Sequence, residues 1–289
     1  MSFPERLQAD AALIEARLQA ALAGKADQPV TQAMRYAVRG GKRLRGFLVL
    51  EGARMLGVPE AQAISAAASV EALHAYSLVH DDLPCMDDDD LRRGQPTVHV
   101  KWDEATAVLA GDALQTLAFD LLTDPALGTE TVRLALVAGL ARASGIDGMV
   151  LGQALDIAAE TAGRPLTLQE ITDLQAGKTG ALIGFSAEAG AILAGADPAP
   201  LRAYAAALGL AFQIADDILD VTGDEAKTGK RVQKDAQAGK ATFVSLLGLS
   251  GARARAAALV DEAEAALASY GAAAQNLIEA ARFVIARDT

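Results

Sequence analysis

Hydrophobic residues recur along this chain at the three- and four-residue spacing of one face of an α-helix. The pattern predicts helices over residues 7–22, 32–38, 42–56, 60–82, 104–122, 129–143, 146–160, 167–193, 199–221, 242–249, 252–270 and 275–287. No convincing run of alternating hydrophobic and polar residues predicts a strand. The fold class that follows is all-α.

One predicted helix, residues 60–82, is rich in alanine and apolar almost all round, so we expect it at the centre of the fold. Pro84 interrupts it. Thr167 and Glu170 form a capping box that opens the helix over 167–193, whose interior glycines predict close packing or a kink. No proline- or serine-rich linker and no short repeat divides the chain, which predicts one domain over residues 1–289.

Composition and charge narrow the class of protein. Apolar residues make up 52% of the 289 positions and aromatic residues only 4%, a composition typical of helices. The net charge of −11 argues against a nucleic-acid partner. One cysteine, Cys85, gives no disulfide framework, and we find neither a signal-peptide pattern nor an apolar stretch flanked like a membrane span. We therefore expect a soluble, cytoplasmic protein with no stable membrane insertion.

Two clusters of aspartates end apolar helical runs. The first contains six carboxylates in ten residues: Asp81, Asp82, Asp87, Asp88, Asp89 and Asp90. The second contains Asp216, Asp217 and Asp220, of which the first and last share one helix face and are opposed by the helix dipole. Ionised carboxylates in such numbers are either solvated, as in an acidic loop, or neutralised by cations. Two clusters together favour Mg²⁺, which proteins hold through a few carboxylates and substrate phosphates.

Two residues of the first cluster, Asp87 and Asp88, are candidates to share a cation with Asp81. On an unbroken helix Asp88 shares its face, whereas a break at Pro84 could bring Asp87 back beside it. An EF-hand is excluded, because neither the aspartate spacing nor the required glycine fits.

Basic residues accompany the aspartates. Lys42 and Arg45 share a helix face directly after Gly40 and Gly41, and a helix N-terminus with nearby cations is an anion site. The further candidates are Arg92, Arg93, Lys178, Lys230 and Lys240. No phosphate-binding P-loop fits the glycine spacing, and three histidines with one cysteine support neither zinc chemistry nor a hydrolase triad.

These motifs resemble those of the trans-isoprenyl diphosphate synthases. The matching segments are Gly40-Gly41-Lys42-Arg43-Leu44-Arg45, Asp81-Asp82-x4-Asp87 with Leu91-Arg92-Arg93-Gly94, Gly152-Gln153-x2-Asp156, Lys178-Thr179, Phe212-Gln213-x2-Asp216-Asp217-x2-Asp220 and Thr228-Gly229-Lys230. They cover essentially the whole chain in the family's order. Within the family, Ala75-Tyr76-Ser77-Leu78 before the first aspartates resembles the bacterial farnesyl diphosphate synthases.

The resemblance implies a helical bundle around a central cavity, a homodimer, and isoprenoid diphosphate substrates. It implies three Mg²⁺ ions, replaceable by Mn²⁺, on Asp81, Asp82, Asp87, Asp156, Asp216, Asp217 and Asp220. It places the allylic diphosphate on Arg92, Gln153, Lys178, Thr179, Gln213, Lys230 and Lys240, with Arg92, Lys178 and Lys230 as the catalytic cations. It places isopentenyl diphosphate on Gly41, Lys42, Arg45, His74 and Arg93.

The expected reaction is condensation of isopentenyl diphosphate with an allylic diphosphate. Tyr76 lies about 7.5 Å before Asp81 along an ideal helix and Ser77 lies more directly beneath it, so the pair is the expected floor of the product cavity. A large residue followed by a small one predicts a C15 product. The alternatives are a C20 synthase of the same fold, a class I terpene cyclase that uses one aspartate-rich metal site, and an inactive partner subunit.

Overall fold

The computed structural model describes residues 2–161, 163–222 and 242–286. Its α-helices are α1 (Phe3–Leu22), α2 (Pro29–Ala37), α3 (Leu44–Met55), α4 (Glu60–Asp81), α5 (Val98–Lys101), α6 (Glu104–Leu121), α7 (Glu130–Ser144), α8 (Met149–Glu160), α9 (Leu168–Gln175), α10 (Ala181–Ala194), α11 (Ala199–Thr222), α14 (Phe243–Ala266) and α15 (Gln275–Ala286). Short helical turns are η1 (Pro125–Leu127), η2 (Ala176–Gly180) and η3 (Ala268–Ala274). The predicted all-α class is confirmed.

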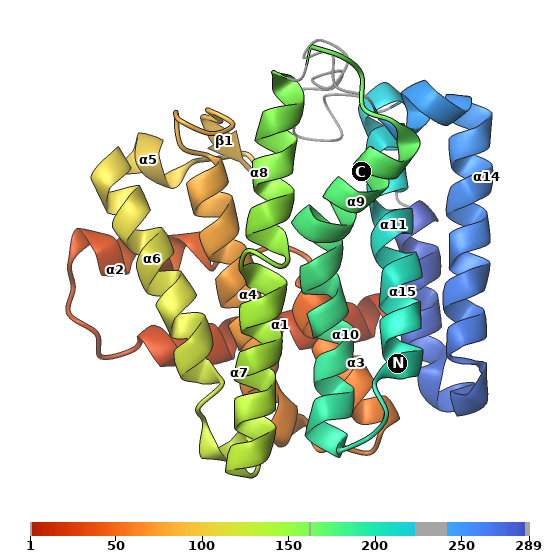
Figure 1. Cartoon of the computed structure of the whole chain (residues 1–289). Helices are drawn as coiled ribbons and strands as arrows, with labels where there is room; N and C mark the ends of the chain where they lie inside the picture. Colours follow the sequence, from red (N-terminus) through yellow and green to blue (C-terminus); the bar gives the residue numbers. More distant parts are fainter. Residues whose placement is uncertain (1, 162, 223–241, 287–289) are drawn as a thin grey trace.

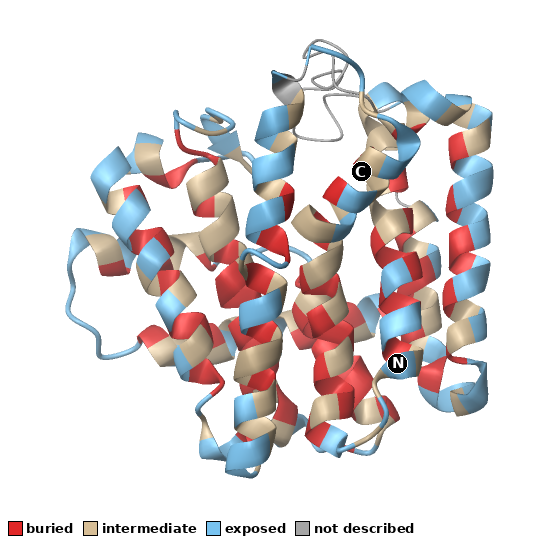
Figure 2. Ribbon diagram, viewed as in Figure 1, coloured by how far each residue is buried: buried red, intermediate tan, exposed pale blue. Residues whose placement is uncertain are grey.

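Helix α4 lies where the sequence placed it, inside the bundle. It packs against α1, α3, α6 and α10, and its small side chains are mostly buried. The buried residues form two clusters, and α3 and α10 contribute to both. Figure 1 shows the hairpin strand β1 and the upper ends of α4, α8 and α11 at one end of the molecule. Buried residues fill the space between the helices below that end (Figure 2).

Glycines allow the helices to approach closely, as predicted for the 167–193 segment. A Cβ on Gly190 of α10 would lie 2.4 Å from the carbonyl carbon of Gly52 on α3. That segment also bends as predicted, because the π-helical turn η2 separates α9 from α10. The two helices predicted over 242–249 and 252–270 are both present within α14, which is kinked between them at Gly248 with φ of 70° and ends at Ala266.

The start of α3 differs from the prediction. The helix begins at Leu44 rather than at residue 42. Gly40, Gly41 and Arg43 have φ values of 68°, 88° and 53°, and this left-handed backbone cannot extend a right-handed helix. Lys42 therefore belongs to the loop before α3.

Two short strands were also missed. Strands β1 (Leu91–Arg92) and β2 (Gln95–Pro96) pair antiparallel. Arg93 and Gly94 between them both have positive φ, as a two-residue type I′ hairpin turn requires. The arginine–glycine pair was the available signal, but strands of two residues are too short for hydrophobic alternation to show.

Two helical stretches pass a length-and-hydropathy test for a membrane span, Glu130–Ala159 and Phe243–Ala266. The first is divided between α7 and α8, and the second bends at Gly248. Each uninterrupted piece is therefore shorter than the roughly 20 residues that span a bilayer core.

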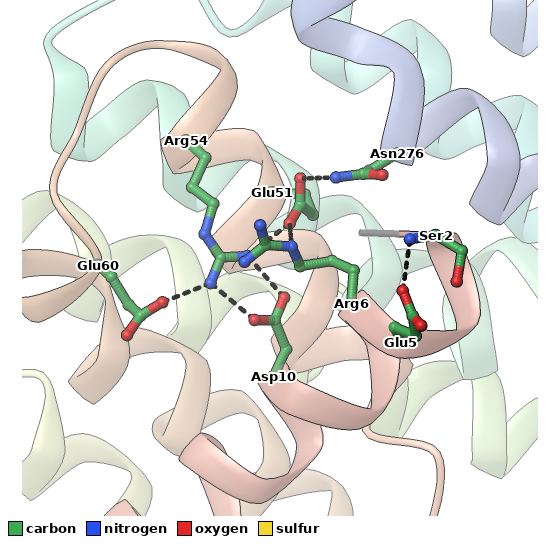
Figure 3. A network of polar contacts seen from close by, with 8 residues as sticks. All are labelled: Ser2, Glu5, Arg6, Asp10, Glu51, Arg54, Glu60 and Asn276. Atoms are coloured by element: carbon green, nitrogen blue, oxygen red, sulfur yellow. Dashed lines mark hydrogen bonds and ion pairs between the residues drawn. The ribbon is translucent and has the colours of Figure 1, made fainter.

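A polar network ties the two ends of the chain to α3 (Figure 3). Arg54 of α3 donates from both terminal nitrogens to the carboxylate of Asp10 on α1, at 2.6 Å each, and also contacts Glu51 and Glu60. Asn276 of α15 donates to Glu51 at 2.9 Å. Asp10 and Glu51 are 0% and 4% exposed, so their charges depend on these partners.

Arg54→Met is expected to lower the melting temperature by about 10 °C. Losing one partner of a buried ion pair costs about 3–5 kcal/mol, because the remaining carboxylates stay buried and uncompensated. The matched control is Arg202→Met, which removes an exposed ion pair with Glu188 and should cost at most about 1 kcal/mol. Calorimetry of both variants checks the difference, and equal shifts would contradict this role of the network.

Candidate active site

A cavity of about 1960 Å³ is lined by residues of α3, α4, α8, α11, the turn η2 and the β1–β2 hairpin. With one exception, the predicted site residues that the structure describes line it: Gly41, Lys42, Arg45, His74, Tyr76, Ser77, Asp81, Asp87, Arg92, Arg93, Gln153, Asp156, Lys178, Thr179, Gln213, Asp216, Asp217 and Asp220. The exception is Asp82. Lys230 and Lys240 lie outside the described residues. Segments far apart in sequence thus meet in one cavity.

The first aspartate cluster turns back on itself after α4. Beyond Pro84 the amide of Asp87 donates to the carbonyl of Asp81 at 2.9 Å, so the break brings Asp87 beside Asp81. Asp88 has φ of 50°. Burial raises the pKa of Asp81 to about 6, Lys178 opposes this, and Asp87 adds to it. Asp87 is therefore the better candidate to share a cation with Asp81.

Within the part of the chain that the structure describes, no three aspartate, glutamate, histidine or cysteine side chains converge closely enough to hold a metal alone. The two aspartate clusters instead line one cavity. This arrangement fits Mg²⁺, since that ion keeps several ligands from water or substrate phosphates.

The hairpin directs its two arginines to different places. Arg92 donates from Nε to both carboxylate oxygens of Asp82, at 2.8 and 3.0 Å, which accounts for Asp82 being absent from the cavity wall. Arg93 lies over Gly41: a Cβ there would be 2.7 Å from the guanidinium. Any larger residue at position 41 would require the Arg93 side chain to move. The contribution of Gly41 is therefore the room that it leaves for the guanidinium.

Positive charge gathers on the α3 side of the cavity. Nε of Arg45 is buried and has no hydrogen-bond partner among the described residues. Burial lowers the pKa of Arg45, an effect partly offset by Glu71 and Asp216. Arg45 lines the cavity, so its guanidinium is available to an anion bound there.

Helix α8 and the turn η2 meet backbone to backbone. A Cβ on Gly152 would lie 1.9 Å from the amide nitrogen of Lys178. Lys178 Nζ pairs with Asp156 at 2.5 Å, and Gln213 of α11 donates to the hydroxyl of Thr179 at 2.9 Å. The π-helical turn thus joins α8 to α11 and presents Lys178 to the cavity.

Asp217 has a structural contact within the second cluster. Its carboxylate accepts a hydrogen bond from the amide of Phe243, the first residue of α14, at 2.7 Å. This bond holds the end of α11 against the start of α14. Asp216 and Asp220 line the cavity from the same helix.

These motifs and their geometry can be compared with known proteins. The family model for polyprenyl synthetase matches residues 27–278. This chain belongs to the polyprenyl synthetase family. The resemblance identified from the motifs is thereby confirmed.

Relatives of this polyprenyl synthetase agree over nearly its full length. Farnesyl diphosphate synthase of Escherichia coli (strain K12) is 49% identical over 277 residues, covering 92% of each chain. The crystal structure of an FPP/GFPP synthase from Zymomonas mobilis has 47% identity and a TM-score of 0.90, covering 98% of both chains. A Helicobacter pylori geranyltransferase, complexed with magnesium and isoprenyl diphosphate, has 36% identity and a TM-score of 0.82, covering 99% of this chain and 97% of that one.

Sequence reasoning missed one residue of this polyprenyl synthetase site. Glu71 lines the cavity beside the α3 cations although it is only 3% exposed. It is the one acidic residue between Glu60 and Asp81, in a helix whose side chains there are mostly apolar or small. A carboxylate at a position expected to be buried requires a cationic partner, and this was the available signal.

His74 is expected to remain neutral at pH 6.5, where an ordinary histidine is half protonated. Burial lowers its pKa well below that value, and Arg45 and Arg93 lower it further. The imidazole proton shifts in an NMR pH titration check this. Adding inorganic diphosphate should raise the pKa of His74, because a bound anion offsets the arginine charges. An imidazole already half protonated at pH 6.5 without the anion would contradict this electrostatic description.

Proposed function

We propose that this chain is a farnesyl diphosphate synthase. It condenses isopentenyl diphosphate with dimethylallyl diphosphate and then with geranyl diphosphate, and each step releases diphosphate. One observation carries the proposal: the two aspartate clusters and the basic residues Lys42, Arg45 and Arg93 line a single cavity. The proposal places one diphosphate between the aspartate clusters, held through cations, and the other beside Arg45. A relative 49% identical over most of the chain bears the same name.

Magnesium fits the first of these sites. Asp81, Asp87 and Asp216 would hold it together with the allylic diphosphate, and Mn²⁺ is expected to substitute. Bound there, the ions neutralise the diphosphate and stabilise it as a leaving group. A magnesium-bound member of the fold, the Helicobacter pylori geranyltransferase, supports this assignment.

The other residues bind and orient the substrates. Arg92, Lys178 and Lys230 are assigned to the allylic diphosphate, and Lys42, Arg45 and Arg93 to isopentenyl diphosphate. As the allylic carbon–oxygen bond breaks, the C3–C4 double bond of isopentenyl diphosphate attacks the allylic cation. The new cation then loses a proton from C2. The departing diphosphate is the assigned proton acceptor.

The apolar wall of the cavity protects the carbocation. Met149, Val150 and Ile157 of α8 line it, together with Val108 of α6. Excluding water there prevents the cation from being captured as an alcohol.

The test is a diphosphate-release assay on purified protein with Mg²⁺. Release is expected only when isopentenyl and geranyl diphosphate are both present, and chelation of Mg²⁺ should abolish it. Release from geranyl diphosphate alone would overturn the proposal in favour of a class I terpene cyclase. No release with either allylic primer would favour an inactive partner subunit.

Product length is assigned to Tyr76 and Ser77. Both line the cavity, and the Tyr76 ring packs edge-on against His80, with centroids 5.0 Å apart. Burial raises the pKa of the Tyr76 phenol, as do the charges of Asp112 and Asp81. Tyr76 therefore projects from α4 toward α6, before Asp81 along the helix. The proposal is that a growing chain meets the ring there.

Tyr76→Ala is expected to shift the main product from C15 to C20 or longer, because it removes the ring that blocks the cavity. Tyr76→Phe keeps the ring and should keep the C15 product. Chromatography of the dephosphorylated alcohols checks both variants. An alanine variant that still stops at C15 would show that another residue forms the floor.

A homodimer is part of the proposal. Apolar side chains remain exposed on two helices that flank the cavity: Leu109 on α6, and Leu151 and Leu155 on α8. Figure 2 shows exposed positions along both helices. Such a surface suits an interface between two copies. A soluble, cytoplasmic location remains a prediction.

A further inference from the structure

Glu71 is a buried carboxylate among the cations of the α3 side, and the proposed reaction gives it no role. It lies on α4 and is 3% exposed. A charge buried to this degree needs both ionic and hydrogen-bonding partners. Its contacts therefore show which groups it holds in place.

Its first oxygen caps α3. Oε1 accepts a hydrogen bond from the amide of Gly46 at 2.8 Å. Gly46 is the third residue of α3, and the residue before the helix, Arg43, provides no side-chain cap. Side chains such as aspartate or serine usually accept this hydrogen bond from within the same segment. Here a carboxylate from the neighbouring helix does so, at the positive end of the α3 dipole.

Gly46 provides the space for this contact. A Cβ at that position would lie 3.1 Å from Cγ of Glu71 and 2.6 Å from Cδ1 of Ile14. A side chain there would push α4 and α3 apart. The glycine and the carboxylate thus form one contact between two helices.

The second oxygen balances a buried arginine. Oε2 lies 3.5 Å from Nη1 of Arg43, which is 5% exposed and also donates to the carbonyl of Val38. Arg43 has a left-handed backbone, an uncommon conformation for a residue with a side chain. Anchoring its guanidinium inside the protein holds that turn, and the turn sets where α3 begins.

The same negative charge acts on the substrate-side arginines. The Glu71 carboxylate opposes the lowering of the Arg45 pKa by burial, and it opposes the same lowering of the Arg93 pKa. One carboxylate among several cations reduces their mutual repulsion and still leaves a net positive charge for a diphosphate.

We propose that Glu71 is a positioning residue for isopentenyl diphosphate. It caps α3 and anchors Arg43, and thereby aims Arg45 and Lys42 at the diphosphate without touching the substrate. The inference rests on the proposed function. It differs from a purely structural role in one respect: loss of the charge should affect one substrate and not the other.

The test compares three variants with the wild type. Glu71→Gln keeps the shape and the acceptor for Gly46 but removes the charge, and Glu71→Asp keeps the charge on a shorter side chain. The control is Ser69→Ala on the same helix. Ser69 is equally buried and donates to the carbonyl of Ala118 at 2.6 Å, away from the α3 cations. Melting temperatures and the KM for each substrate are measured for all four proteins.

Glu71→Gln should raise the KM for isopentenyl diphosphate about tenfold and leave the KM for geranyl diphosphate within about twofold. Glu71→Asp should show the same selectivity with a smaller rise. Ser69→Ala should lower the melting temperature alone. Should Glu71→Gln not fold, Glu71→Asp carries the comparison.

Equal changes in both KM values, or an unchanged KM for isopentenyl diphosphate, would overturn the inference. So would a larger rise in that KM with Asp than with Gln, since the charge of Glu71 would then not be what makes the effect selective for one substrate. The wild-type control separates the two proposals: if it forms no condensation product, the proposed function fails, whereas an active wild type with unselective variants refutes only the role of Glu71.

Discussion

Asp81→Asn is expected to lower turnover about 10³-fold while the protein stays folded. The change removes the charge of a proposed cation ligand at the end of α4, and Lewis-acid stabilisation of a leaving group contributes several kcal/mol, each 1.36 kcal/mol being tenfold in rate. Asp87→Asn should have an effect of similar size, because the turn at Pro84 brings its backbone against that of Asp81. Turnover at saturating substrate and Mg²⁺ checks both variants.

Asp88→Asn is the matched comparison, and its turnover should stay within a few-fold of wild type. Asp88 adopts a left-handed backbone with φ of 50°, a conformation that asparagine tolerates well. A loss at Asp88 as large as at Asp81, with a mild effect at Asp87, would reverse the assignment of the metal ligands.

Gly152→Ala is expected to lower turnover by about 10²-fold or more. The new methyl group would lie 1.9 Å from the amide nitrogen of Lys178, so α8 and η2 must separate. That movement displaces Lys178 and its partner Asp156 from the proposed site of the allylic diphosphate, and a misplacement of about 1 Å can cost 10²-fold.

The control for this substitution is Gly184→Ala. Gly184 lies in α10, and a Cβ there meets nothing within 4 Å. Alanine is the better helix former by up to about 1 kcal/mol, so this variant should be active and at least as stable as wild type. Equal losses in the two variants would show that the α8–η2 contact does not position the site.

The helices could be predicted because helical periodicity is a local signal. The aspartate and lysine motifs are short stretches of sequence, and they identified residues that the fold brings to one cavity. The break at Pro84 could be predicted, but only the folded turn shows that it favours Asp87 over Asp88. The start of α3 was misplaced because Arg43 adopts a left-handed backbone held by contacts from other helices. No local pattern encodes such contacts.

The hydrogen bonds and ion pairs between different segments of the site could not be predicted from the sequence either. The sequence placed Asp82 among the metal ligands, yet in the fold it receives Arg92 ten residues later, through a hairpin too short to predict. Asp217 likewise meets the start of α14 across a long connection. These partners are set by where helices end in space, which sequence spacing does not give.

The most direct test of the central claim is the size of the product. Purified protein is given Mg²⁺, labelled isopentenyl diphosphate and geranyl diphosphate, and the dephosphorylated alcohols are separated by chromatography. A dominant C15 alcohol is the predicted result. A dominant C20 alcohol would keep the condensation but contradict the floor at Tyr76, and the absence of any condensed product would contradict the proposed function itself.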